Sequence, residues 1–145
     1  MTPPTIVQSE IGAAIERAQS ALLASQAPDG HWVGELEANS TITSEYLLFC
    51  HLLDRPDRER EAKMVRYLRG CQVADGGWSL YEGGPSNVSA TIKAYFAMKV
   101  AGVSVDDPAM ARARGLIHGW GGPVEADVFT KILLEIGRAS CRERV

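Results

Sequence analysis

The chain has 145 residues, which is the length of one domain with a modest core and too short to enclose a large cavity by itself. Its 46% of hydrophobic and 23% of charged residues are typical of a folded globular chain and exclude a disordered or fibrous one. Fifteen basic and 18 acidic residues give a net charge of -3, so the chain lacks the positive field that holds nucleic acid.

Apolar residues that recur at steps of three and four predict six helices, with no segment that favours a strand. Asparagine, serine and aspartate residues mark the starts of four of these helices, while glycine and proline mark ends. The predicted N-caps are Asn39 or Ser40, Asp57, Ser86 or Asn87, and Asp107. The predicted ranges are about 6–26, 40–53, 58–72, 88–101, 108–118 and 124–136.

The predicted helices alternate in character. Helix 58–72 is densely charged, and only the stripe of Met64, Val65, Leu68 and Cys71 remains for packing, so it belongs on the outside. Helix 40–53 is apolar over nearly its whole circumference and is expected to be buried on most sides. Helix 88–101 is again more apolar than its partner. Polar outer and apolar inner helices imply two concentric layers.

A seven-residue motif, Gln-x-x-Asp-Gly-x-Trp, occurs twice with an offset of 46 residues. Its first copy is Gln26, Asp29, Gly30 and Trp32, and its second is Gln72, Asp75, Gly76 and Trp78. A period in this range with two helices per unit is typical of a helical array. The glutamine amide is expected to bond free groups at helix ends with the tryptophan ring over it, while Asp-Gly supplies the turn. This motif therefore indicates architecture and not an active site.

The motif resembles the Gln-Trp repeat of the squalene-hopene and oxidosqualene cyclases. Other segments are similar to the N-terminal region of the bacterial enzymes, namely 32–34, 45–46, 50–51, 53–55, 80–81, 83–85 and 128–130. The resemblance covers about residues 10–136. It implies an all-α fold of helical hairpins with Gln-Trp turns, part of an α/α barrel (α/α toroid). Residues 1–137 would form the N-terminal region of that barrel, and the arginine-rich residues 138–145 would be a non-native tail.

The resemblance also implies a function, the cation-driven polycyclisation of squalene to hopanoids without a cofactor. The family works as a peripheral, monotopic enzyme on the cytoplasmic side of the membrane, usually as a homodimer. Its acid is the middle aspartate of an Asp-x-Asp-Asp motif, which these 145 residues lack. The adjacent pair Asp106 and Asp107 precedes Pro108 and is typical of a helix cap. We therefore predict no catalytic residue here and no activity for the chain alone.

Two residues are candidates for the wall of the substrate cavity. Glu45 is the one charge within the apolar helix 40–53, and the resemblance places such a glutamate near the cavity end where water quenches the cation. A buried charge paired with arginine or lysine is the alternative. Phe129 resembles a cavity aromatic of the family, and a core phenylalanine is the alternative. Asp127 departs from the basic or amide residue that the resemblance leads us to expect.

Other classes of function were weighed against a cyclase. A freestanding α/α repeat module that binds a lipid or protein remains the main alternative. A prenyltransferase β subunit would need zinc ligands, but His31, His51 and His118 share no ligand spacing, so no metal is expected. The three cysteines form no Cys-x-x-Cys pair and are expected to be free thiols. Charges in the first helix argue against a signal peptide. Because these residues contain no long apolar run, we expect no spanning helix among them.

Overall fold

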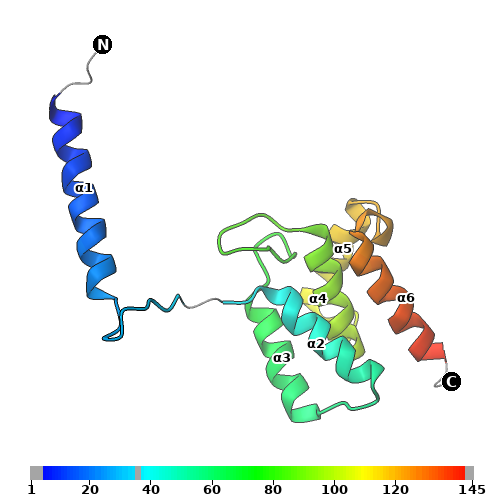
Figure 1. Cartoon of the computed structure of the whole chain (residues 1–145). Helices are drawn as coiled ribbons and strands as arrows, with labels where there is room; N and C mark the ends of the chain where they lie inside the picture. Colours follow the sequence, from blue (N-terminus) through cyan, green and yellow to red (C-terminus); the bar gives the residue numbers. More distant parts are fainter. Residues whose placement is uncertain (1–4, 35–36, 143–145) are drawn as a thin grey trace. The chain divides into compact units, whose positions relative to one another are not determined.

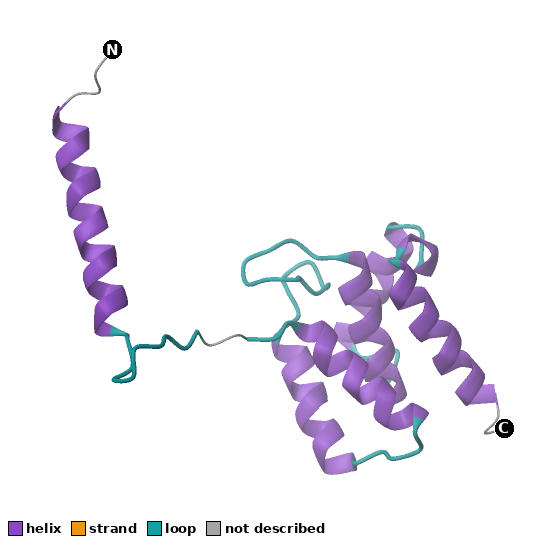
Figure 2. Ribbon diagram, viewed as in Figure 1, coloured by secondary structure: helices purple, strands orange, loops and turns teal. Residues whose placement is uncertain are grey.

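The computed structural model describes residues 5–34 and 37–142. These residues form six α-helices and one short 3-10 helix, and within them only isolated β-bridges occur in place of strands (Figures 1 and 2). The all-α prediction is therefore confirmed. The helices in chain order are α1 (Thr5–Ala24), α2 (Ser40–Leu52), α3 (Arg58–Gly70), α4 (Val88–Val100), α5 (Pro108–Gly119), η1 (Pro123–Glu125) and α6 (Val128–Arg142).

The chain divides into two compact units, Met1–Glu37 and Ala38–Val145. The first contains α1 and the first Gln-Trp turn, and the indole of Trp32 donates a hydrogen bond back to the carbonyl oxygen of Leu22 in the last turn of α1 at 2.7 Å. The second contains all the other helices. The Trp78 indole likewise donates to the carbonyl oxygen of Leu68 in α3, so each copy of the motif directly follows the helix to which its tryptophan bonds.

Helix α4 is the centre of the second unit, because it contacts α2, α3, α5 and α6. It offers small side chains, Ala90, Ala94 and Ala97, all fully buried, and small residues let neighbouring helices approach closely. The core that surrounds them is apolar. Its other buried members are Leu47, Leu48, Leu68, Trp78, Met98, Met110 and Ala113.

The outer position predicted for α3 is confirmed. Leu68 is buried in the core, and Met64, Val65 and Cys71 pack against it half-buried, while most of the charged side chains of α3 are exposed. Glu61 is the exception among these charges, since it is buried and its Oε1 lies 2.7 Å from Nε2 of His51 on α2. A charged helix can therefore cover a core with a narrow apolar stripe.

Side chains cap the helices of the second unit as expected. In each case the side-chain oxygen accepts a hydrogen bond from a backbone N–H of the first turn, a donor that has no partner within the helix. The N-caps are Asn39 for α2, Asp57 for α3, Asn87 for α4 and Asp107 for α5. The two choices that the sequence left open are thus decided in favour of asparagine.

The predicted start of the last helix, at about residue 124, is wrong by four residues. Pro123–Glu125 forms a 3-10 turn, and α6 begins at Val128. Asp127 causes the delay, because its Oδ1 accepts the Thr130 backbone N–H at 2.7 Å and so caps α6. The helix continues to Arg142, past the boundary predicted at 137, while residues 143–145 lie outside the described part of the chain.

The expected burial of α2 on most sides is also wrong. Only Ser40, Ser44, Leu47 and Leu48 are buried, and the other apolar side chains of α2 remain exposed. The helix contacts α4 and α3 and, to a lesser extent, α6. Its side chains Ile42, Tyr46, Phe49 and Leu52 nevertheless stay exposed in the part of the chain that the structure describes.

Candidate functional site

An apolar groove of about 500 Å³ lies between α2 and α6. The groove is open, because its apolar lining side chains are exposed apart from Leu133, which is half-buried. It is lined by Ile42, Glu45, Tyr46 and Phe49 from α2 and by Phe129, Ile132, Leu133 and Ile136 from α6. Glu45 is the only charged residue in this lining.

The structure brings the two sequence-predicted cavity residues, Glu45 and Phe129, onto the walls of this one groove. Phe129 is 75% exposed, so it lies outside the core that the described residues form. Nearby, Arg60 donates to the hydroxyl of Tyr46 at 2.7 Å and holds that ring from the outer layer. Three aromatic rings and one carboxylate therefore share the site.

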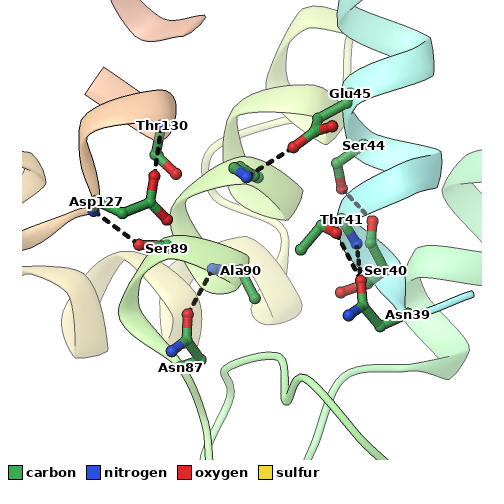
Figure 3. A network of polar contacts seen from close by, with 11 residues as sticks. Asn39, Ser40, Thr41, Ser44, Glu45, Asn87, Ser89, Ala90, Asp127 and Thr130 are labelled. Atoms are coloured by element: carbon green, nitrogen blue, oxygen red, sulfur yellow. Dashed lines mark hydrogen bonds and ion pairs between the residues drawn. The ribbon is translucent and has the colours of Figure 1, made fainter. Parts of the chain in front are cut away.

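The carboxylate of Glu45, labelled in Figure 3, is bound to Lys93. Lys93 lies on α4. The lysine Nζ donates to Glu45 Oε1 at 2.6 Å, and Lys93 is only 9% exposed. The side chain of Glu45 is 43% exposed, so it is anchored at one end while remaining accessible to the groove. The lysine partner that the alternative for Glu45 expected is present, but the carboxylate is accessible and not buried.

Asp127 adds a second carboxylate near Lys93. Its pKa is lowered, chiefly because the Thr130 backbone N–H donates to the carboxylate, and also by the hydroxyls of Ser89 and Thr130 and the charge of Lys93; partial burial opposes this shift. The Asp127 backbone N–H in turn donates to Ser89 Oγ at 2.9 Å. Figure 3 shows this network at the N-terminal ends of α2, α4 and α6. The Lys93 ammonium therefore binds the Glu45 carboxylate of α2 and also lowers the pKa of the Asp127 carboxylate that caps α6.

Sequence reasoning did not identify Lys93, although a signal was available. Glu45 follows the N-cap Asn39 by six residues, and Lys93 follows the N-cap Asn87 by six. The two charges therefore stand at the same height on α2 and α4, which are neighbours in the structure. The cap positions give this match once the two helices are known to be neighbours.

The two Gln-Trp turns repeat their internal hydrogen bonds with the same offset of 46 residues. The glutamine Nε2 donates to the glycine carbonyl, from Gln26 to Gly30 at 2.6 Å and from Gln72 to Gly76 at 2.8 Å. The Trp78 indole donates to the Leu68 carbonyl at 2.7 Å, as Trp32 does to Leu22 in the first unit. The tryptophan thus bonds the carbonyl at the end of the preceding helix. The Gln72 amide bonds a carbonyl at another helix end, that of Ala109 in the first turn of α5, at 2.9 Å.

The Asp-Gly pair forms the turn in both copies. Gly30 and Gly76 have φ angles of +91° and +97°, a backbone conformation that residues other than glycine rarely adopt. The Ser86 hydroxyl, and then the Gly77 backbone N–H, lower the pKa of Asp75 by donating to its carboxylate. Asp29 instead pairs with His31. These hydrogen bonds and ion pairs join groups of the chain itself, so the role of the two turns is structural.

Neither a metal centre nor a membrane span was found in the part of the chain that the structure describes. Across 5–34 and 37–142, no three potential metal ligands cluster, and no helix combines the length and the apolar character needed to cross a bilayer. Cys50 and Cys71 are free thiols.

Comparison with known proteins shows which family this chain is similar to. The family profile described as "Squalene-hopene cyclase N-terminal domain" matches residues 15–140. The chain belongs to this family. It is 52% identical over 132 residues to the squalene-hopene cyclase of Zymomonas mobilis, covering 90% of this chain and 20% of that protein.

More distant members share the same region. The squalene-hopene cyclase of Alicyclobacillus acidocaldarius is 43% identical over 122 residues, covering 84% of this chain and 19% of that protein. Lanosterol synthase of Mus musculus is 38% identical over 113 residues, covering 77% of this chain and 15% of that protein. The chain thus spans about a fifth of the length of the squalene-hopene cyclases that it matches.

Within the squalene-hopene cyclase N-terminal domain, the groove has a defined chemical capacity. Its aliphatic and aromatic walls suit a hydrocarbon, and aromatic faces can stabilise a passing positive charge. Its single carboxylate is held in place by a buried ammonium. The described groove residues offer surface and charge, with no strong acid among them.

Proposed function

We propose that this chain is the N-terminal part of a triterpene cyclase of the squalene-hopene type, which converts squalene to hopanoids through a cationic polycyclisation. The observation that carries the proposal is the apolar groove with Tyr46, Phe49 and Phe129 on its walls and Glu45 as its only charge. Membership of the family and the names of the relatives support it.

The groove residues would act on the substrate without exchanging a proton at the start of the reaction. A strong acid must protonate an unactivated alkene, and we assign this acid to residues that follow in the longer protein. The aromatic rings would stabilise cationic intermediates in a site from which water is excluded. Glu45, fixed by Lys93, would orient water or balance charge near one end of the cavity.

In the intact protein, residues 1–137 would form one part of an α/α barrel. The alternation of the charged α3 and the central, largely buried α4 supports a polar outer and an apolar inner layer. Further helices would complete the barrel and cover the exposed face of α2. We retain residues 138–145 as a non-native tail within this proposal.

We further propose, from the family resemblance, that the intact enzyme is a peripheral membrane protein on the cytoplasmic side and a homodimer. Squalene is insoluble in water, so an enzyme that acts on it gains from contact with the bilayer that contains it. The surface responsible for this contact is assigned to the rest of the protein.

A chimera tests the proposed function. Residues 1–137 replace the matching segment of the Zymomonas mobilis squalene-hopene cyclase, and the products formed from squalene are measured by gas chromatography and mass spectrometry. We expect polycyclic product from the chimera and none from the 145-residue chain alone. A folded chimera without product, beside an active parent enzyme, would contradict the proposal.

The exposed groove also supports a second candidate, a freestanding α/α repeat module that binds a lipid or a protein. This candidate requires the 145-residue chain to be a stable monomer that binds its ligand by itself. Saturable binding of a fluorescent fatty acid by the monomer, together with an inactive chimera, would favour it over the cyclase.

A further inference from the structure

Two consecutive residues of the groove, Glu45 and Tyr46, are each held by a cation from a different helix. Lys93 of α4 donates to the Glu45 carboxylate at 2.6 Å. Arg60 of α3 donates through Nη1 to the Tyr46 hydroxyl at 2.7 Å. The second donor is a charged guanidinium, and hydrogen bonds with a charged partner are stronger than neutral ones. The Tyr46 ring is therefore tied at its far end to the outer helix.

The Arg60 guanidinium is itself oriented by the start of its helix. Asp57, the N-cap of α3, accepts the backbone N–H of Arg60 through Oδ1 at 3.1 Å, while its Oδ2 lies 3.6 Å from Arg60 Nε. The pKa of Arg60 is raised, first by the hydrogen bond to Tyr46 and to a smaller extent by the charge of Asp57. A chain of contacts thus leads from the cap of α3 to the wall of the groove.

A second space lies on the other side of the Tyr46 ring. This α2–α3 pocket has a volume of about 270 Å³, and Tyr46 and Phe49 line both the pocket and the groove. A space of this size with several polar partners can hold water. The side chains of Tyr46 and Phe49 therefore separate the apolar groove from a polar pocket. The charged residues that line the pocket are Arg55, Asp57, Arg60 and Glu61.

We infer that Arg60 is a positioning residue for the cyclisation: by holding the Tyr46 hydroxyl, it keeps that ring between the groove and the α2–α3 pocket and so limits the water that reaches the cation. The inference rests on the proposed function, which supplies the cation. It assigns a role in the reaction to an exposed arginine of the outer helix, which touches the substrate only through Tyr46.

A carbocation in the groove can end in two ways. It can lose a proton from a neighbouring carbon, so that a C–H bond breaks and a C=C bond forms. It can instead bind water, so that a C–O bond forms and the bound water releases one proton to the solvent. The first route gives an alkene and the second an alcohol, and exclusion of water favours the first. The ratio of alcohol to alkene therefore reports how much water reaches the cation.

The chimera that carries residues 1–137 tests the inference in isotopically labelled water, with alcohol and alkene products measured by gas chromatography and mass spectrometry. Arg60→Met should raise the ratio of alcohol to alkene about threefold, and Tyr46→Phe should raise it similarly, because each removes one partner of the same hydrogen bond. The double variant should resemble the single variants. Arg60→Lys can still donate to the hydroxyl and should restore most of the parent ratio.

Arg66→Met is the matched control, because Arg66 is exposed on the same helix and lines neither the groove nor the α2–α3 pocket. Its product ratio should equal that of the parent chimera. A purely structural role of Arg60 would lower the total amount of product without changing the ratio. That result in both Arg60→Met and Tyr46→Phe would overturn the inference, and so would a ratio raised equally by Arg66→Met.

Urea denaturation of the 145-residue chain examines the hydrogen bond without catalysis. Arg60→Met and Tyr46→Phe together should lower the folding equilibrium constant about threefold less than the product of their single effects. Effects that simply multiply would show that the two side chains are not coupled and would overturn the inference.

The two measurements separate this inference from the proposed function. An inactive chimera of the parent sequence, beside an active Zymomonas mobilis enzyme, would contradict the proposed function and the control of water with it. An active chimera whose product ratio does not respond to Arg60→Met or Tyr46→Phe would overturn this inference alone and leave the proposed function intact.

Discussion

At the scale of single residues, Lys93 holds the polar part of the groove together. A buried ammonium is costly unless it is paired, and Lys93 has the Glu45 carboxylate at 2.6 Å and also lowers the pKa of Asp127. Glu45 lies on α2 and Asp127 caps α6 from the residue before it, while Lys93 lies on α4. Its charge therefore links the inner helices as well as fixing the one carboxylate of the groove.

Replacing this lysine should destabilise the chain. In Lys93→Met the Glu45 carboxylate loses its partner, but it is partly solvated, so we expect a decrease in the free energy of unfolding of about 1–3 kcal/mol. Urea denaturation followed by circular dichroism measures this change. Lys99→Met, exposed on the same helix, is the matched control and should change stability by no more than about 0.5 kcal/mol.

A double variant shows whether the pairing itself is responsible. Glu45→Leu combined with Lys93→Met leaves no unpaired charge, so part of the stability lost in Lys93→Met should return. If the double variant were less stable than the parent chain by the sum of the effects of Glu45→Leu and Lys93→Met measured singly, the two residues would not be coupled.

The groove shows which residue roles a sequence can predict. Glu45 was identifiable because a lone charge in an apolar helix needs a reason, and its possible pairing with a lysine was foreseen. The exposure of Phe129 was not, because helical spacing places a side chain on a face but does not say what covers that face. The partner Lys93 required knowing that α2 and α4 are neighbours with their caps at the same height.

At the scale of the elements, helix starts were predicted best where a side chain caps them. Asp57 and Asp107 were correct because aspartate before a helical pattern has one strong local role. The start of α6 was misplaced because Val124 continues the apolar pattern, whereas the cap Asp127 was judged by its departure from a family pattern. A polar residue that departs from a family pattern can still have a local structural role.

The Asp127 cap makes the stability of α6 dependent on pH. The pKa of Asp127 is lowered in the folded chain, so between the folded pKa and the ordinary value, about 3.9, the unfolded chain binds more protons. Its contribution is therefore complete above that ordinary value and is lost as the pH falls through the folded pKa. We expect thermal melts to show that Asp127→Asn, which can still cap the helix, loses less stability on acidification than the parent chain.

Asp106→Asn serves as the control for acidification, because Asp106 is exposed and donates its own backbone N–H to Ser104 in place of capping a helix with its side chain. Its melting temperatures should follow those of the parent chain from pH 7 to about pH 3, a range that spans the ordinary carboxyl pKa. An Asp127→Asn curve parallel to the parent curve would show that the cap charge does not contribute.

At the scale of the whole molecule, the sequence repeat predicted the structure correctly, whereas the apolar pattern of α2 did not predict its burial. The offset of 46 residues correctly predicted two equivalent turns, because their hydrogen bonds are local and follow from the motif. Burial of α2 was overestimated, because an apolar pattern around a helix does not say which neighbouring elements cover it. The fully buried face of α4 shows the opposite case, since four neighbouring helices are present to cover it.

The exposed walls of the groove lead to a prediction about association. Apolar side chains on α2 and α6 form one continuous patch, and patches of this kind drive proteins together in water. In sedimentation velocity, the 145-residue chain should therefore show a sedimentation coefficient that rises with concentration. The double variant Phe49→Ser and Phe129→Ser should remain monomeric over a range of concentrations in which the parent chain associates.

The control must remove equally exposed apolar side chains from elsewhere. Tyr81→Ser with Val124→Ser does so, since these residues are 67% and 70% exposed and lie outside the groove. We expect this variant to associate like the parent chain, because the patch between α2 and α6 is intact. A parent chain that stays monomeric and melts at a temperature independent of concentration would show that the groove is stable in water, as a freestanding module requires. If instead the parent chain and this control associate while the Phe49→Ser and Phe129→Ser variant does not, the groove face needs a cover, as the proposed barrel provides.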